Sequence, residues 1–194
     1  MTQLLEKPKE QHFFHSGVEW DRFKSLQDWF SDSPGVRLFY YQGEVEILSV
    51  SPEHEIISRI IGSLVIAYFE EKGIEFTPTG SFTQEKTGVA SAQADESYFI
   101  GNLGTTPDLS IEVVISSGAD KLPRYLALGV PEVWFWEDGL FTLHHLHGKS
   151  YDRIYRSEIP ALAELDMDLL TRCVLMAQTS RLEAVRTFRA AIRE

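Results

Sequence analysis

Hydrophobic residues recur at intervals of three and four in several stretches of the chain, which is the spacing of an amphipathic helix. Such a stripe follows Ser16 and Glu19, a pair with capping-box spacing, and predicts a helix over 17–30. Ser51-Pro52 provides an N-cap and an N1 proline ahead of a broad apolar stripe that ends at Lys72-Gly73, so we predict a long core helix there. A capping-box pair at Ser180 and Glu183 predicts a final amphipathic helix.

Runs rich in β-branched and aromatic residues predict the strands. The runs 37–41 and 44–48 are joined across Gln42-Gly43, which indicates a hairpin, and a second hairpin is expected from 141–147 and 150–155 across Gly148-Lys149. Further strands are predicted at 74–77, 81–85, 97–100, 109–115 and 133–136. The polar, glycine-containing stretch 86–94 is expected to be an exposed connection.

The order strand, short helix, strand over 109–136 predicts a βαβ unit with two parallel neighbouring strands. Combined with the hairpins, this unit predicts an α/β protein with a mixed β-sheet flanked by helices. Trp134 and Trp136 fall on one face of their strand, where we expect them to pack under a helix.

Composition indicates a single globular domain. The chain has 194 residues, of which 43% are hydrophobic and 24% charged. Residues 1–11 contain no apolar core of a secretory signal and are expected to form a flexible tail, which leaves 12–194 as the domain. The one cysteine, Cys173, excludes an intramolecular disulfide and a cysteine-type zinc site, and a cytoplasmic location fits it best. The apolar stretch 56–69 is interrupted by polar residues and falls short of a membrane span.

The formal net charge of −11 argues against broad, sequence-independent coating of nucleic acid. It leaves room for a local basic cleft. The cations expected near the rim of such a cleft are Arg59, Lys86, Lys121 and Arg124.

The acidic residues of two successive strands carry the most informative chemistry. Asp95 opens one predicted strand, Glu112 lies within the next, and Lys121 follows. Asp108 shares a face with Glu112, but four residues of strand separate their Cα atoms by about 13 Å, so Asp95 is the better partner for Glu112. Two carboxylates can hold Mg²⁺ while a substrate phosphate replaces some of its waters, and a lysine beside them can position the attacking water.

Histidines offer a weaker metal signal. His145 and His147 alternate with His144 in a predicted strand, so at most two of the three converge, and a solvated face is the better interpretation. His54, near the start of the core helix, is by default a capping or core histidine.

At these positions the chain resembles the Uma-two family, a restriction-endonuclease-like branch of the PD-(D/E)xK nucleases. The resemblance extends over about 40–136 and includes the ordered set Ala94-Asp95, Ile111-Glu112-Val113, Asp120-Lys121-Leu122 and the run Leu128-Gly129-Val130-Pro131-Glu132-Val133-Trp134. It implies a restriction-endonuclease-like fold and a phosphodiesterase site that uses Mg²⁺, or Mn²⁺ in its place.

The residues depart from the superfamily pattern at two positions. Ala94 replaces the proline before Asp95, and Val114 occupies the position of the ExK lysine. The family commonly places its lysine on the following helix, so the resemblance assigns that role to Lys121. It also places Glu44, His54 and Glu55 at the edge of the metal site.

Our leading hypothesis is a magnesium-dependent DNA endonuclease in which Asp95 and Glu112 ligate the metal and Lys121 orients the attacking water. A homodimer is expected, since cutting both strands of a duplex suits two sites related by a two-fold axis. The apolar stripe over 181–192 could form that contact or dock on its own domain. The alternative is a catalytically silent homo-oligomeric binding or regulatory module that keeps the nuclease fold.

Overall fold

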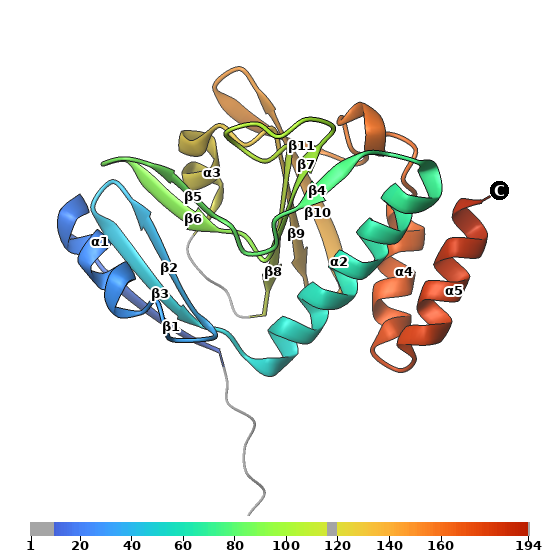
Figure 1. Cartoon of the computed structure of the whole chain (residues 1–194), viewed down its shortest axis with the longest axis horizontal. Helices are drawn as coiled ribbons and strands as arrows, with labels where there is room; N and C mark the ends of the chain where they lie inside the picture. Colours follow the sequence, from blue (N-terminus) through green and yellow to red (C-terminus); the bar gives the residue numbers. More distant parts are fainter. Residues whose placement is uncertain (1–9, 116–119, 194) are drawn as a thin grey trace, which may run out of the picture.

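The computed structural model describes residues 10–115 and 120–193, whose strands form two sheets with helices packed on them (Figure 1). The first sheet has the strand order β1-β3-β2-β6-β5, with every adjacent pair antiparallel. Its strands are β1 (Gln11–His15), β2 (Val36–Tyr41), β3 (Glu44–Ser49), β5 (Thr83–Lys86) and β6 (Ala90–Gln93).

The second sheet is mixed and has the order β11-β10-β9-β8-β7-β4. Its strands are β4 (Phe76–Pro78), β7 (Glu96–Ile100), β8 (Leu109–Val114), β9 (Glu132–Glu137), β10 (Leu140–His147) and β11 (Ser150–Ile154). Within this sheet β8 and β9 pair in parallel, while its other pairs are antiparallel. The helix α3 (Leu122–Leu128) connects the parallel pair, so the predicted βαβ unit and the α/β fold class are confirmed.

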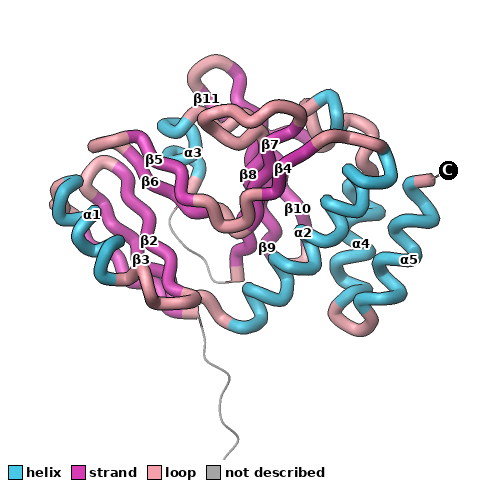
Figure 2. Tube along the Cα trace, viewed as in Figure 1, coloured by secondary structure: helices cyan, strands magenta, loops and turns pink. Residues whose placement is uncertain are grey.

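Three apolar clusters hold the layers together. Figure 2 shows the helices and strands that form these layers. The long helix α2 (Pro52–Lys72), α4 (Met167–Ala177) and α5 (Arg181–Ile192) cover one face of the mixed sheet, where Trp134 and Trp136 are buried as predicted. The other face meets α3 and the antiparallel sheet through a cluster that includes Phe39, Ala92 and Tyr125. The helix α1 (Trp20–Trp29) packs on the antiparallel sheet through Phe23.

The chain passes from one sheet to the other between β6 and β7. Ala94 and Asp95 occupy this junction, and both are buried. The polar stretch predicted over 86–94 as an exposed connection is therefore wrong in its second half, because Ala90–Gln93 form β6 between β2 and β5. Small side chains let this strand lie under α3, and they lack the β-branched signal on which the prediction rested.

Helix starts follow the predicted caps in two of three places. The Ser51 hydroxyl accepts the His54 N–H (3.2 Å), and the Ser180 hydroxyl accepts the Glu183 N–H (3.4 Å). By contrast, α1 begins after Glu19, and the Ser16 hydroxyl donates to Glu44 (3.4 Å) instead of capping it.

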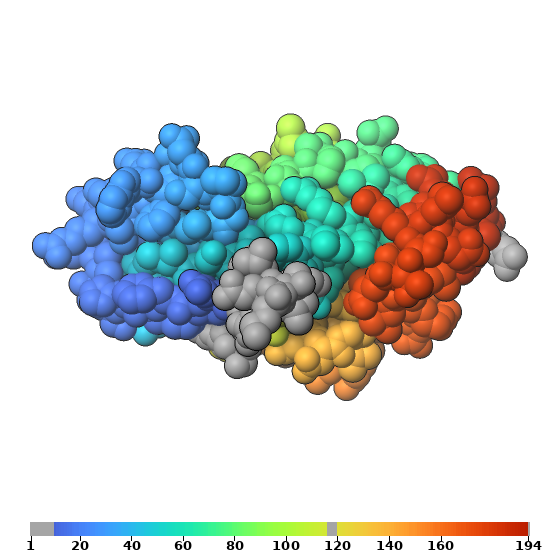
Figure 3. All heavy atoms as spheres, turned by 90° about the horizontal axis from the view of Figure 1, so that it is seen from below, coloured from blue at the N-terminus to red at the C-terminus, as the bar shows by residue number. Residues whose placement is uncertain are grey.

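The two ends of the described chain bear on the predicted flexible tail and on the predicted dimer contact. Figure 3 shows the N-terminal segment and the C-terminal helices at opposite ends of one face. Residues 1–9 of the predicted tail lie outside the described residues, but Gln11 already pairs with Ser49 in β1. The stripe of α5 is buried inside its own domain, where Phe188 is fully enclosed. No helix among the described residues has the length and apolar character needed to cross a membrane.

Candidate active site

Asp95 sits at the junction of the two sheets, with both carboxylate oxygens engaged. Its N–H donates to the Ile111 carbonyl (3.0 Å), and its Oδ2 accepts the Val113 N–H (2.6 Å), so the backbone of β8 fixes the residue. Its Oδ1 faces the Nε2 of His54 (2.7 Å) and forms an ion pair with Arg37. A carboxylate with 3% of its residue surface exposed is thus held by strand and helix together.

Glu112 lies on β8 between Ile111 and Val113, the two residues whose backbone bonds Asp95, and it is fully buried. Its neighbours Ile111 and Val113 point into the core under α2, and alternation therefore turns Glu112 toward α3. There Lys121 Nζ donates to its Oε2 (2.6 Å), and the Tyr125 hydroxyl donates to its Oε1. Burial, and then the charge and hydrogen bond of Glu112, raise the pKa of Tyr125 well above its ordinary value, which keeps the hydroxyl a donor.

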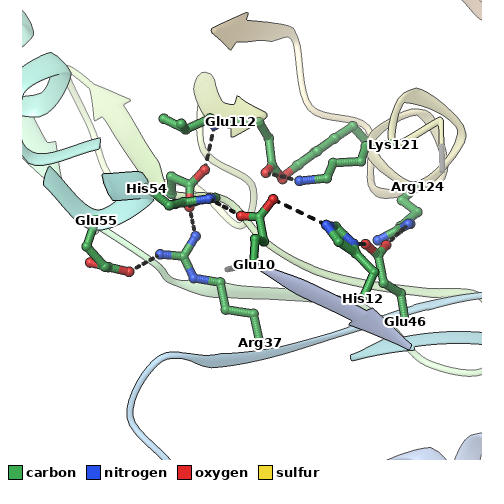
Figure 4. A network of polar contacts seen from close by, with 12 residues as sticks. Glu10, His12, Arg37, Glu46, His54, Glu55, Glu112, Lys121 and Arg124 are labelled. Atoms are coloured by element: carbon green, nitrogen blue, oxygen red, sulfur yellow. Dashed lines mark hydrogen bonds and ion pairs between the residues drawn. The ribbon is translucent and has the colours of Figure 1, made fainter. Parts of the chain in front are cut away.

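The contacts around Asp95 and those around Glu112 form two neighbouring groups joined through the backbone of β8, and we call them together the polar network (Figure 4). Its members are Glu10, His12, Arg37, Glu46, His54, Glu55, Asp95, Glu112, Lys121, Arg124 and Tyr125. The Nδ1 of His54 meets Glu10 Oε1 (2.6 Å), and Glu10 also contacts His12 (3.3 Å). These residues come from β1, β2, β3, α2, β8, α3 and the β6–β7 junction, and the network therefore joins both sheets.

Glu46 and Arg124 anchor the side of the network next to α3. The Arg124 guanidinium donates to Glu46 Oε2, while His12 Nδ1 lies 2.9 Å from Glu46 Oε1. Burial alone would raise the pKa of Glu46, but the charge and hydrogen bond of Arg124 outweigh it and hold that pKa below its ordinary value. Arg124 and Lys121 both lie over the ring of Phe39, at 4.8 and 5.3 Å from its centroid.

Among its described residues, the polar network contains more carboxylates than permanent cations. The cations are Arg37, Lys121 and Arg124, and the carboxylates are those of Glu10, Glu46, Glu55, Asp95 and Glu112. Each of His12 and His54 has both ring nitrogens beside a carboxylate oxygen, whereas a neutral imidazole offers only one N–H.

The residues predicted for the site edge behave differently from one another. His54 contacts Asp95 directly, and Glu55 reaches the network through Arg37 Nη2 (2.8 Å). Glu44 does not join the network: it is exposed and accepts the Ser16 hydroxyl. Asp108 lies at the turn into β8 as expected, where its Oδ2 accepts the Ile100 N–H (2.8 Å).

Sequence reasoning missed Glu10, His12, Arg37, Glu46 and Tyr125 as members of the network. Glu46 stands two residues after Glu44 on the same strand, so a search of that face would have found it. Arg37 opens the β-rich run 37–41 and gave no comparable signal. Of the cations expected at a basic rim, Lys121 and Arg124 are buried in ion pairs, while Arg59 and Lys86 are exposed.

The family model described as "Putative restriction endonuclease" (Uma2) matches residues 20–171. The chain belongs to the Uma2 family. The match runs from the start of α1 into α4 and contains Asp95, Glu112 and Lys121.

Two curated proteins also share a stretch with the chain. Both are described as "1,4-alpha-glucan branching enzyme GlgB 2", one from Rhizobium etli and one from Rhizobium johnstonii. Each is 26% identical over 152 residues, which is 69% of this chain and 20% of the enzyme. The chain thus corresponds to about one fifth of each relative, and the branching activity describes those whole proteins.

Proposed function

We propose that this Uma2 protein is a magnesium-dependent DNA endonuclease that hydrolyses phosphodiester bonds at the polar network. The observation that carries the proposal is the attachment of Asp95 and Lys121 to adjacent residues of β8: Asp95 Oδ2 accepts the Val113 N–H (2.6 Å), and Lys121 Nζ donates to Glu112 Oε2 (2.6 Å). Acid, acid and lysine are the groups that the superfamily pattern requires, and here they come from the sheet junction, a strand and a helix N-cap.

The donor set fits a hard divalent cation. Carboxylate oxygens are the ligands that Mg²⁺ prefers, and Asp95, in the segment before β7, and Glu112, on β8, supply them. When bound there, the ion would lower the pKa of a coordinated water and neutralise charge on the phosphoryl group.

The protein side chains position the reacting groups. Lys121, held by Glu112, is a compact cation able to orient the attacking water or to stabilise charge on the phosphate. His54 orients Asp95 through its Nε2, and Tyr125 orients Glu112 through its hydroxyl. Arg37, fixed between Asp95 and Glu55, presents a guanidinium suited to a phosphate oxygen.

Access to this site requires a local rearrangement, because Asp95, Glu112 and Lys121 are all buried. Glu10 contacts His54 and His12 and directly precedes β1. Since β1 is an edge strand that, within the described part of the chain, pairs with β3 alone, we propose that displacing Glu10 together with β1 opens the network to DNA. An edge strand loses fewer hydrogen bonds on displacement than any interior strand.

The direct test is cleavage of supercoiled plasmid by the full chain with Mg²⁺ and with EDTA. We expect cleavage only with the metal, and a loss of at least about a hundredfold in Asp95→Asn and in Lys121→Gln. Glu44→Gln is the matched control, since Glu44 is an exposed acid outside the network, and it should keep wild-type activity.

A wild-type chain that is folded by circular dichroism but cuts no DNA under any of these conditions would contradict the endonuclease proposal. It would favour the silent module instead, for which the internal pairing of Lys121 with Glu112 and the valine at position 114 are the supporting observations.

The proposal includes a homodimer, with two sites arranged for the two strands of a duplex. Burial of the α5 stripe means that another surface must form the contact. Light scattering at micromolar concentration should give twice the monomer mass, and a monomer mass would contradict this part of the proposal.

A further inference from the structure

A second group of potential metal ligands lies on the β10–β11 hairpin and the loop that follows it. We call it the hairpin cluster: His145 and His147 on one face of β10, and Glu158 after β11. One ligand atom from each residue lies within 4.8 Å of the other two. Alternation along β10 brings only His145 and His147 together, and Glu158 in the following loop supplies the third potential metal ligand, which the strand pattern alone did not predict.

The two imidazoles direct the same ring nitrogen toward the same carboxylate oxygen. The Nε2 of His147 is 2.8 Å from Glu158 Oε2, and the Nε2 of His145 is 3.9 Å from that atom. The ring centroids are 5.1 Å apart. Zinc bonds of about 2.0–2.1 Å in a tetrahedral arrangement need ligand atoms a few ångströms apart, so small side-chain movements would suffice.

A buried carboxylate fixes His145 in the orientation that a metal ligand requires. Glu132, fully enclosed, accepts the Trp134 indole N–H (2.7 Å) at Oε1, and its Oε2 lies 3.0 Å from His145 Nδ1. Because an ionised Glu132 can only accept, His145 Nδ1 carries the proton and Nε2 presents its lone pair. The same Oε2 accepts the Glu158 N–H (2.9 Å), so one buried group positions two of the three ligands.

His147 has the same arrangement at the surface. Its Nδ1 lies 2.8 Å from Asp152 Oδ2, which again leaves Nε2 directed at Glu158. A carboxylate behind each imidazole is the usual outer-shell partner of metal-bound histidine, where it sets the tautomer and raises the basicity of the ligand.

We propose that the hairpin cluster is a zinc site with His145 Nε2, His147 Nε2 and Glu158 as protein ligands and water in the remaining position. Two imidazoles and one carboxylate suit Zn²⁺, whereas Mg²⁺ takes oxygen ligands. This site is separate from the polar network, because the two share no residue.

Zinc titration of the full chain, followed by calorimetry or by competition with a chromogenic chelator, tests the proposal. We expect one zinc ion per chain at this site and a loss of more than about a hundredfold in affinity in His147→Ala and in Glu158→Gln. Asp152→Asn, which removes an outer-shell partner at an exposed position, should weaken binding by about 10–100-fold.

His144→Gln is the matched control. It removes a histidine from the same strand but from its opposite face, where the ring packs on Phe135 (5.7 Å between centroids), and zinc affinity should stay within about twofold of wild type. Asp95→Asn should likewise leave this affinity unchanged, which separates the site from the polar network. A wild-type chain that binds no zinc, or equal affinities in wild type, His147→Ala and Glu158→Gln, would show that the hairpin cluster forms ion pairs only.

Discussion

Val114 stands two residues after Glu112 on the same face of β8, which is the position of the lysine in the ExK pattern. The lysine beside Glu112 comes instead from the N-cap of α3. If the reaction needs a positive charge next to Glu112, the location of the lysine ammonium group should matter more than the sequence position that supplies the lysine.

A relocated lysine tests this idea. Lys121→Gln should lose most DNA cleavage, and adding Val114→Lys to that variant should restore at least about tenfold, because the new side chain projects to the same face as Glu112. Val114→Lys alone, with Lys121 intact, is the control for damage to β8. No recovery in a folded double variant would contradict the assignment of Lys121 as the catalytic cation.

The buried pair of Glu46 and Arg124 predicts a specific loss of stability in acid. The folded-state pKa of Glu46 lies below its ordinary value of 4.5, so its charge stabilises the fold above that pH, and the stabilisation is lost as the pH falls below it. In urea unfolding, Glu46→Gln should cost about 3–5 kcal/mol near pH 7, where it leaves Arg124 unpaired.

As the pH is lowered from about 6 to about 3.5, the unfolding free energy of Glu46→Gln should fall less than that of the wild type, because the variant lacks the carboxylate that becomes protonated. Glu44→Gln, on the same strand but exposed, should follow the wild-type pH dependence. Parallel pH curves for wild type and Glu46→Gln would contradict the role given to this pair.

At the level of single residues, Asp95, Glu112 and Lys121 were chosen from strand ends, spacing and family resemblance. The structure pairs Lys121 with Glu112 and bonds Asp95 to the backbone of β8, and the catalytic and metal-binding roles of the three residues stay predictions. Glu46 and Arg37 were missed, because a charged residue in an alternating strand usually faces solvent and nothing in its spacing shows that another layer covers it. Glu44 was included for its nearness in sequence and lies outside the network.

Among the elements, α5 shows that tertiary packing decides which surface covers the apolar stripe of a helix. Its Ala184, Phe188 and Ile192 face α2 and α4 within the same chain, and Arg189 and Arg193 add ion pairs to Glu71 on α2. The sequence predicted the helix and its stripe but left the occupant of that stripe open.

Removal of one buried ring should show where α5 docks. Phe188→Ala should lower the unfolding free energy by about 3–5 kcal/mol, since the ring is fully enclosed. Leu182→Ala, on the same helix but 62% exposed, should change it by less than about 0.5 kcal/mol. Similar effects of the two substitutions would mean that α5 does not pack as described.

Elements with strong local signals were predicted, and elements defined by their neighbours were not. The bounds of α2 could be predicted, because Ser51 and Pro52 mark its start and Gly73 marks its end. β6 consists of small residues, and β1 is an edge strand with exposed Phe13 and Phe14, so neither has the alternating apolar pattern of a half-buried strand. Both form because the β2–β3 hairpin has two outer edges: β1 pairs with the edge of β3, and β6 pairs with the edge of β2.

For the whole molecule, a net charge of −11 limits how DNA could be bound. Lys121 and Arg124 are already paired inside the network, so neither is free to meet a phosphate. With about two phosphate contacts, the slope of log affinity against log salt should be about −2 in duplex binding measured by fluorescence anisotropy. A slope steeper than about −6 would contradict this expectation, because it would require several more phosphate contacts.

Magnesium binding to the polar network tests the central claim most directly. In calorimetric titrations at pH 7.5, the wild-type chain should bind one Mg²⁺ ion in the millimolar range, because Asp95 and Glu112 supply the oxygen ligands. Asp95→Asn should abolish this binding, and Glu44→Gln should retain it. A wild-type chain that binds no magnesium, or an Asp95→Asn chain that binds it equally well, would contradict the claim that this network is a metal-dependent active site.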